Sequence, residues 1–233
     1  MKTIKKSGLI WIGVLSLSLV FAACDSSSDP SSATASEDGI QYKVDPEARV
    51  ITNSWPYCDS TYYGELNDAE TEGLFFMREE EKMARDVYLT MYEKYPLPVF
   101  KFIPKSESAH MAAVKVLLDK YELADPVGDN PIGVFINGDI QNLYDDLVEK
   151  GSVSEIEALK AGALIEETDI TDLDTHIAEI EENDDILTVY TNLRRGSTHH
   201  LKAFVWNLKV RGVEYVPQVL SLEDYNDIII INP

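Results

Sequence analysis

The sequence has few cysteines and few basic side chains, and both shortages exclude classes of protein. Two cysteines among 233 residues cannot form a disulfide framework or a zinc–thiolate site. The 20 Lys and Arg residues are outnumbered by 41 Asp and Glu residues, which gives a net charge of −21. Because binding to a nucleic-acid backbone needs clustered positive charge, we expect no nucleic-acid partner.

A hydrophobic run of membrane-spanning length is also missing. The most apolar stretch, residues 8–23, contains 16 residues, short of the ~20 that span a bilayer comfortably. It follows three lysines and ends in small residues, a pattern that predicts a signal peptide over residues 1–23. The chain as a whole is 45% hydrophobic, which is enough to form a core and excludes overall disorder.

The end of this stretch, Val-Phe-Ala-Ala-Cys at residues 20–24, resembles a bacterial lipobox, although Leu is usual where Phe21 stands. The resemblance implies that Cys24 is lipidated after cleavage and becomes the new N-terminus. An ordinary cleaved signal with an incidental cysteine is the alternative. Loss of residues 1–23 makes the net charge −24, so we expect membrane attachment through lipid only, in the bacterial cell envelope.

The rest of the chain is predicted to contain a tether and one helical domain. Residues 24–66 are expected to form a lipid-anchored, flexible tether and a segment that wraps the domain, because residues 25–38 have no large apolar side chain. Residues 67–233 have helical periodicity and should form an all-α domain.

Capping and breaking residues divide this domain into helices. Long helices are expected from Asn67 or Asp68 to about Tyr95, from about Pro104 to Tyr121, from Ser154 to about Glu182, and from Asp184 or Asp185 to before Gly212. Short helices are expected over residues 139–150 and after residue 221. Four long helices with a long crossover between the second and third are typical of a ferritin-like four-helix bundle.

Each long helix places a potential metal ligand on the face that should be buried. These ligands are Glu81 on the first helix, Glu107 and His110 on the second, Glu166 on the third and His200 on the fourth. Glu167 and His199 lie beside this face as alternative ligands, whereas Glu79 and Glu80 are expected to point into solvent. Buried carboxylates persist only with a compensating partner, and two iron or manganese ions are such a partner.

The known ligand set for a metal pair in such a bundle is one Glu from each of two helices and Glu-x-x-His from each of the other two. Glu107 and His110 have this spacing. The fourth helix instead reads Ser197-x-x-His200, with the imidazole present and the carboxylate missing. Whether His199, Glu167 or water compensates for Ser197 is left open.

Short segments of the chain resemble known ferritin-like proteins. Residues 81–88, Glu-Lys-Met-Ala-Arg-Asp-Val-Tyr, resemble the first metal-binding helix of rubrerythrins, in which a ligand glutamate precedes Ala-Arg and an inward tyrosine. Residues 77–204 look like a ferritin-like family called domain of unknown function 2202. The matching segments are Glu-Glu-Glu-Lys-Met-Ala-Arg-Asp-Val-Tyr from residue 79, Ser-Glu-Ser-Ala-His-Met from residue 106, Ile-Glu-Glu-Thr-Asp-Ile from residue 165 and Gly-Ser-Thr-His-His-Leu-Lys-Ala-Phe from residue 196. The resemblance implies a ferritin-like bundle and, by extension, a carboxylate-bridged metal pair, but no particular activity.

The leading hypothesis is an envelope-anchored di-iron or di-manganese oxidase, peroxidase or ferroxidase that acts on iron or a small oxidant. Tyr88 is its candidate for relaying an electron or a proton, with core packing as the alternative role. A metal-binding or metal-delivery lipoprotein is a second hypothesis, and a metal-free interaction module is a third. In the third, Arg85 and the histidines would neutralise the buried acids. Arg85 is expected to face partly inward beside Glu81 and to pair with a nearby carboxylate such as Asp169 or, alternatively, with the candidate ligands. A homodimer is also compatible with the sequence.

Overall fold

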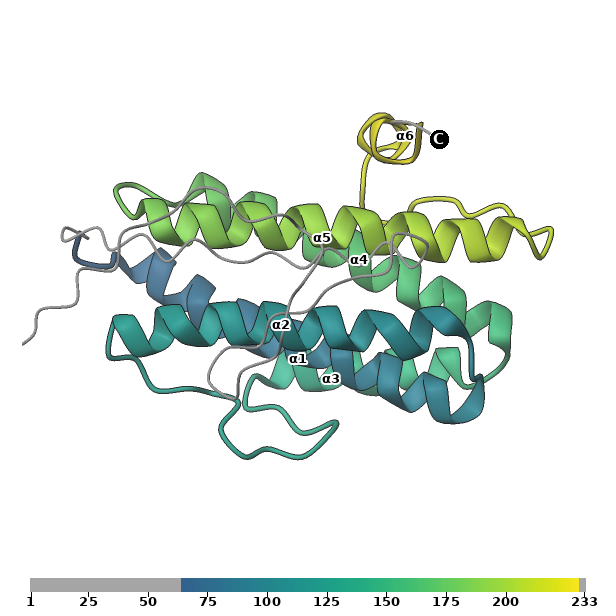
Figure 1. The fold of residues 1–233 in the computed structure, drawn as a ribbon, viewed down its shortest axis with the longest axis horizontal. Coiled ribbons are helices and arrows are strands. Elements are labelled where there is room, and N and C mark those ends of the chain that lie inside the picture. The colour runs from purple at the N-terminus through teal and green to yellow at the C-terminus, as the bar shows by residue number, and fades with distance from the viewer. Residues whose placement is uncertain (1–63, 231–233) are drawn as a thin grey trace, which may run out of the picture. The chain divides into compact units, whose positions relative to one another are not determined.

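The computed structural model describes residues 64–230, which form six helices and no strand (Figure 1). The all-α prediction is therefore confirmed for this part of the chain. The predicted signal peptide, the lipidation site Cys24 and most of the predicted tether lie outside the described residues. Among the six helices, none combines the length and apolar character that a membrane-crossing segment needs.

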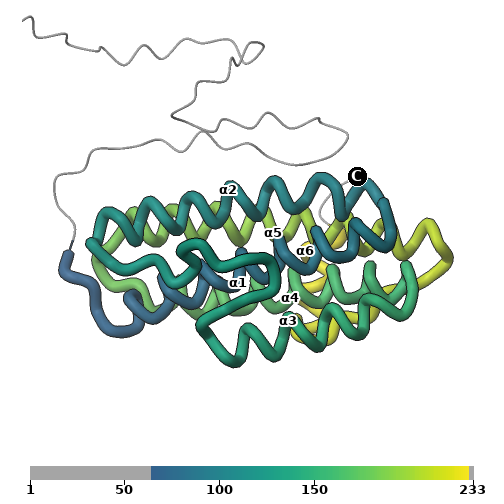
Figure 2. The backbone as a smooth tube through the Cα atoms, turned by 90° about the horizontal axis from the view of Figure 1, so that it is seen from below, coloured from purple at the N-terminus to yellow at the C-terminus, as the bar shows by residue number. Residues whose placement is uncertain are grey.

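Four long helices and two short ones make up the domain. The long helices are α1 (Asp68–Lys94), α2 (Pro98–Lys120), α4 (Glu155–Ala178) and α5 (Asp184–Lys209), and the short ones are α3 (Gly138–Gly151) and α6 (Leu222–Ile230). Helix α1 packs mainly against α2 and α4 mainly against α5, and contacts of α1 with α4 and of α2 with α5 join the two pairs. The short turns that close the two pairs lie at opposite ends of the helices (Figure 1). The chain therefore crosses over between α2 and α4, and α3 belongs to this crossover (Figure 2).

The predicted caps explain where two of the long helices begin. The Asn67 side chain accepts a hydrogen bond from the Glu70 backbone N–H at 2.7 Å, and the Glu70 carboxylate accepts one from the Asn67 N–H at 2.9 Å. This reciprocal capping box satisfies two backbone donors that the helix leaves unpaired. The Ser154 hydroxyl caps α4 through a single hydrogen bond, which it accepts from the Glu157 N–H at 3.2 Å.

Two predicted boundaries were wrong by a turn or more. Helix α2 begins at Pro98, six residues before the predicted start at Pro104, and Pro104 lies inside it. Proline is well suited to the first helical position, because its missing N–H has no partner there in any case. At Pro104 the same missing N–H costs one helical hydrogen bond. Helix α4 ends at Ala178 and stops short of Glu182, and the cap residue Glu179 donates its N–H to the His176 carbonyl.

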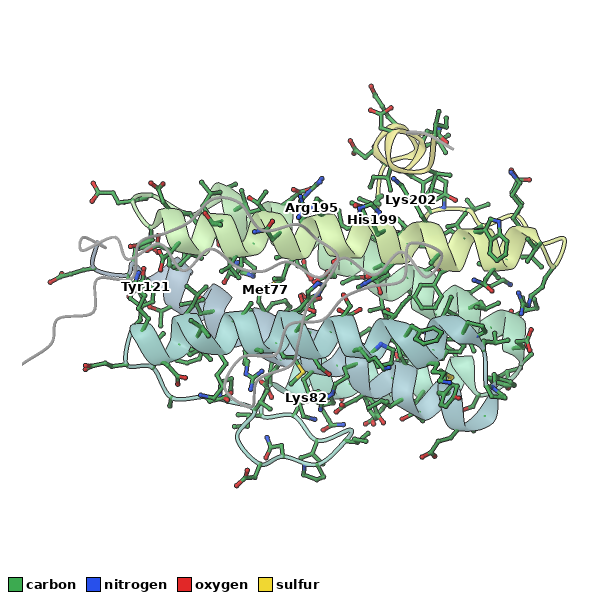
Figure 3. The ribbon with its side chains drawn as sticks, viewed as in Figure 1. Met77, Lys82, Tyr121, Arg195, His199 and Lys202 are labelled. Atoms are coloured by element: carbon green, nitrogen blue, oxygen red, sulfur yellow. The ribbon has the colours of Figure 1, made fainter. Side chains whose placement is uncertain are left out.

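The crossover is held against α1 by buried charged side chains, one of which, Glu79, was wrongly expected to be in solvent. Glu79 is 3% exposed and accepts hydrogen bonds from the N–H groups of Ile136 and Asn137, just before α3. Lys82, beside the crossover in Figure 3, pairs with Asp86 at 2.5 Å and donates to the Pro131 carbonyl at 2.8 Å. Because the ammonium and carboxylate are both buried and both hydrogen-bonded, they fix the crossover at this place on α1.

The buried interior consists of two apolar clusters with a polar layer between them. One cluster contains Phe100, Leu159 and Phe204, and the other contains Leu74, Leu117 and Leu193. Along α1, α2 and α5, the predicted metal ligands fall between the residues of the two clusters, and on α4 Glu166 lies among residues of the first cluster, two turns before Leu173 of the second. The proposed site is therefore enclosed by apolar side chains on both sides.

Candidate metal centre

The structure brings the predicted ligands of all four long helices together in the polar layer. Glu81, Glu107 and Glu166 are each 2% exposed, and His110 and His200 are also buried. Each lies on the inward face of its helix, as the 3.6-residue periodicity predicts. Carboxylates this well covered by protein are costly unless a positive charge or a proton compensates them.

These residues form two groups that share one carboxylate. The first group is Glu81, Glu107 and His110. Each of these residues offers one ligand atom, and the three atoms lie within 4.8 Å of one another. The second group is Glu107, Glu166 and His200, with the same spacing. Such distances allow each group to hold one ion, with Glu107 able to bridge the two.

Each oxygen of the Glu107 carboxylate faces a different histidine. Oε2 lies 2.8 Å from Nδ1 of His110, and Oε1 lies 2.9 Å from Nδ1 of His200. His110 Nδ1 is also 3.1 Å from Glu81 Oε2, and His200 Nδ1 is 3.4 Å from Glu166 Oε2. The arrangement repeats on the two sides of Glu107, with one further glutamate and one histidine on each side.

Several ligand atoms in this layer have no hydrogen-bond partner. Within the described part of the chain, this is true of Glu81 Oε1, Glu107 Oε1 and His200 Nδ1, all of them buried. Glu107 Oε1 and His200 Nδ1 are 2.9 Å apart, yet they are not aligned as donor and acceptor. Buried polar atoms in proteins are nearly always paired. The unpaired atoms of this layer therefore need a further partner, and a cation bound between the carboxylates and the imidazoles would provide it.

The pKa values of the proposed ligands are shifted by burial and by the charges of the acids and imidazoles that face one another. Burial raises the pKa of Glu81 to about 7, although His110 beside it acts in the opposite direction. Burial would also raise the pKa of Glu107, but His200 and His110 outweigh it and lower the value to about 2. Burial opposes protonation of His200, but Glu107 and Glu166 raise its pKa to about 10. Without a cation, protons on the imidazoles therefore provide the positive charge that the carboxylates need.

Two further contacts shape the site. The Tyr88 hydroxyl is buried and donates a hydrogen bond of 2.5 Å to Glu166 Oε1, and its ring packs against Phe204 with centroids 5.2 Å apart. The predicted inward position of Tyr88 is thus confirmed, and its hydroxyl contacts one of the candidate ligands. His110 lies against α5 at Gly196, where a Cβ atom would be 2.6 Å from Nε2 of the ring.

Glu167 has a different environment from Glu166, and it belongs to neither group. Its carboxylate accepts a hydrogen bond from the Tyr215 hydroxyl and others from the backbone N–H groups of Gln218, Val219 and Leu220. Both oxygens are occupied in this way. Glu167 therefore anchors the segment between α5 and α6, and of the two adjacent glutamates only Glu166 faces the histidines.

His199 also lies outside both groups. It is half-buried, and Figure 3 shows it with Arg195 and Lys202 on the side of α5 that is turned away from α1 and α2. His176, which did not fit the predicted pattern, is on α4 and pairs with Glu179. His110 and His200 are therefore the two histidines that face the carboxylates.

Two predictions about neighbouring charges were wrong. Arg85 was expected to pair with Asp169 or the candidate ligands, but its guanidinium pairs with the adjacent Asp86 at 2.8 Å. Glu80 is not in solvent: it is 2% exposed, and its Oε2 has no hydrogen-bond partner among the described residues. Asp169 was predicted only as a partner of Arg85 and not as a ligand; it is buried and accepts a hydrogen bond from Ser197. Its position three residues after Glu166, the spacing that separates Glu107 from His110, was the signal that could have identified it.

The comparisons with known proteins identify a family. The family described as "Uncharacterized protein domain (DUF2202)" matches residues 70–232. The uncharacterized protein MJ0754 of Methanocaldococcus jannaschii is 52% identical over 164 residues, which make up 70% of this chain and 88% of that protein. The crystal structure of hypothetical protein MJ0754 from Methanococcus jannaschii is similar with a TM-score of 0.72 at 50% identity, over 74% of this chain and 98% of that one. The chain therefore belongs to the DUF2202 family.

Proposed function

We propose that this protein is a ferritin-like metalloprotein that holds a pair of iron or manganese ions in its polar layer. The order of four long helices, with a crossover between the second and third, supports the ferritin-like assignment. The proposal depends above all on one observation. Buried atoms of Glu81, Glu107 and His200, from three different helices, have no hydrogen-bond partner among the described residues, and each of these residues belongs to one of the two groups that share Glu107.

The residues present fit such a pair in number and in chemical type. Glu81 and His110 would help to hold one ion and Glu166 and His200 the other, and Glu107 belongs to both groups, with each of its oxygens near one of the two histidines. Mixed carboxylate and imidazole ligands suit iron and manganese. When bound, an iron pair supplies electrons and Lewis acidity for reactions with dioxygen or peroxide.

The protein's own side chains prepare the site for this chemistry. The two apolar clusters limit the access of water from either side. The Tyr88 hydroxyl donates a hydrogen bond to Glu166 Oε1. This bond fixes the orientation of the Glu166 carboxylate and places a phenol next to the proposed centre. We therefore propose an activity of the oxidase, peroxidase or ferroxidase type, with a small oxidant as substrate.

A second candidate function is metal binding or delivery without turnover. It is favoured by Ser197, which provides a hydroxyl where the expected ligand set has a carboxylate. The third hypothesis, a metal-free interaction module, relied on Arg85 and the histidines to neutralise the buried acids. Arg85 pairs with Asp86 instead, whereas His110 and His200 both face the Glu107 carboxylate. If the purified protein oxidises a reducing substrate when peroxide is added, the enzyme hypothesis is favoured over metal delivery.

Metal analysis of protein purified without added chelator tests the proposal. We expect two iron or manganese atoms per chain in the wild type and a large loss in Glu107→Gln and His110→Ala. His176→Ala is the matched control, because this histidine is on α4 but outside both groups. Unchanged metal content in both site variants, or no metal in any of the proteins, would contradict the proposed centre.

We also propose that the protein is attached to the cell envelope through lipid on Cys24. Support comes from the sequence of residues 1–24 and from the acidic composition, which makes electrostatic binding to anionic lipid headgroups unfavourable. Attachment would place the helical domain outside the cytoplasm, where it would meet its metal and its oxidant.

A further inference from the structure

One buried carboxylate beside the proposed centre has no positively charged partner in the described part of the chain. Asp169 is 5% exposed, and its Oδ1 has no hydrogen-bond partner among these residues. Its Oδ2 accepts a hydrogen bond from the Ser197 hydroxyl on α5. One oxygen is thus held in place, and the other is left available in the buried polar layer.

The electrostatic surroundings of Asp169 are unfavourable without a cation. Burial raises its pKa well above the usual range, and Glu81, Glu166 and Glu107 raise it further because they are negative and close. Glu80 is also close to Asp169, because burial and then the negative charge of Asp169 raise the pKa of the Glu80 carboxyl. An isolated buried carboxylate must take up a proton or bind a cation.

The packing of α4 against α5 places Asp169 at the level of the first ligand group. Along α4, Glu166 is opposite His200, and one turn later Asp169 is opposite Ser197. The neighbouring Gly196 contacts the His110 ring, so this turn of α5 faces His110. Ser197 precedes His200 by three residues, as Glu107 precedes His110. Asp169 therefore provides a carboxylate next to the position at which α5 has only a hydroxyl.

We propose that Asp169 is a metal-binding residue that completes the group of Glu81, Glu107 and His110, and that Ser197 positions it. This inference depends on the proposed metal pair. The carboxylate comes from α4, and the Ser197 hydroxyl orients it by donating to Oδ2. Glu81 of α1, Glu107 of α2 and Asp169 of α4 would then each offer a carboxylate to the first ion, and His110 would offer an imidazole.

Titration of the metal-free protein with Mn²⁺ tests this assignment, with bound metal measured after equilibrium dialysis. We expect the wild type to bind two ions per chain and Asp169→Asn to bind one ion well and the other at least tenfold more weakly. Asn has almost the same size as Asp, so the fold should be kept. Asp174→Asn is the control, because Asp174 is on the same helix but pairs with Arg194 at the surface.

Moving the carboxylate from position 169 to position 197 tests whether Asp169 binds the ion or only supports the fold. In the double variant Asp169→Ala/Ser197→Glu, a carboxylate is provided by α5 instead of α4, and we expect the ion that Asp169→Asn binds weakly, the one beside Glu81 and His110, to bind well again. Two ions bound by Asp169→Asn with wild-type affinity would overturn the role of Asp169 but leave the metal pair intact. Loss of both ions in Asp169→Asn together with a lower unfolding temperature of the metal-free protein would also overturn it, in favour of a structural role. A wild type that binds no Mn²⁺ or Fe²⁺ would overturn both proposals.

Discussion

At the residue scale, the position of His110 depends on a glycine in the facing helix. The ring lies so close to Gly196 that a Cβ there would be 2.6 Å from Nε2. Such a contact is much shorter than a van der Waals separation, so any larger residue must displace the imidazole or push α5 away. The metal geometry proposed for His110 thus requires a small residue at position 196.

Gly196→Ala should therefore weaken metal binding. Overpacking of a buried position typically costs about 1–3 kcal/mol, so we expect metal affinity to fall roughly tenfold, as measured by competition with a chelator of known affinity. Gly138→Ala is the control, because a Cβ at Gly138 meets nothing within 4 Å. Equal affinities in the two variants would show that the His110 ring is not constrained as described.

The protonation of the ligands leads to a pH dependence of metal binding. In the metal-free protein, the pKa of His200 is about 10 and that of Glu81 is about 7. At neutral pH a bound ion must therefore displace a proton from His200 and, in part, from Glu81. We expect affinity to rise with pH between pH 6 and 9 and protons to be released on binding, measurable by titration in weakly buffered solution. Affinity that is independent of pH would contradict this account.

Sequence periodicity was sufficient to predict which proposed ligands face inward, but it did not predict which neighbouring acidic side chains are buried. Glu81, Glu107, His110, Glu166 and His200 are on inward faces, and a 3.6-residue repeat shows this without any tertiary structure. Glu80 and Asp169 are also buried, because two helices approach each other at these positions. Such contacts depend on helix crossing and side-chain direction, which a single sequence does not provide.

At the scale of elements, two adjacent glutamates of α4 serve different parts of the fold. Glu166 faces the histidines, whereas Glu167 holds the segment between α5 and α6 through the Tyr215 hydroxyl and three backbone N–H groups. No helix periodicity could reveal the role of Glu167, because its partners lie about 50 residues later in the chain.

Glu167→Gln and Glu166→Gln should have separable effects. Hydrogen bonds to a charged group contribute about 1.5–3 kcal/mol, so we expect Glu167→Gln to lower the free energy of unfolding by about this amount. Hydrogen exchange should become faster over residues 213–230, and metal content should not change. Glu166→Gln should lower metal content and leave exchange in that segment unchanged. Loss of metal in Glu167→Gln alone would reverse the two assignments.

Helix boundaries were predictable where a local cap determined them. Asn67 and Ser154 cap α1 and α4 as expected from their side chains. The start of α2 was misplaced because Pro98 and Pro104 are both compatible with a first turn, and tertiary packing decides between them. Pro104 is buried in the interior of α2, where favourable packing offsets the loss of one backbone hydrogen bond.

At the scale of the whole molecule, the acidic composition and the N-terminal segment predict how the protein is attached. A net charge of −24 after removal of residues 1–23 gives no electrostatic attraction to anionic lipid. In bacterial cells, we expect the protein to fractionate with membranes and Cys24→Ala to shift most of it to the soluble fraction. Cys58→Ala is the control and should remain with the membranes. Soluble wild-type protein would exclude the lipid anchor.

The helical domain is organised around one charged layer between two apolar clusters, and the proposed metal pair accounts for that layer. Diffraction data collected above and below the iron or manganese absorption edge, from crystals of natively purified protein, test this claim most directly. The account predicts two anomalous peaks on either side of the Glu107 carboxylate, one beside Glu81 and His110 and the other beside Glu166 and His200. No peak in this layer, in crystals grown from protein supplied with both metals, would contradict it.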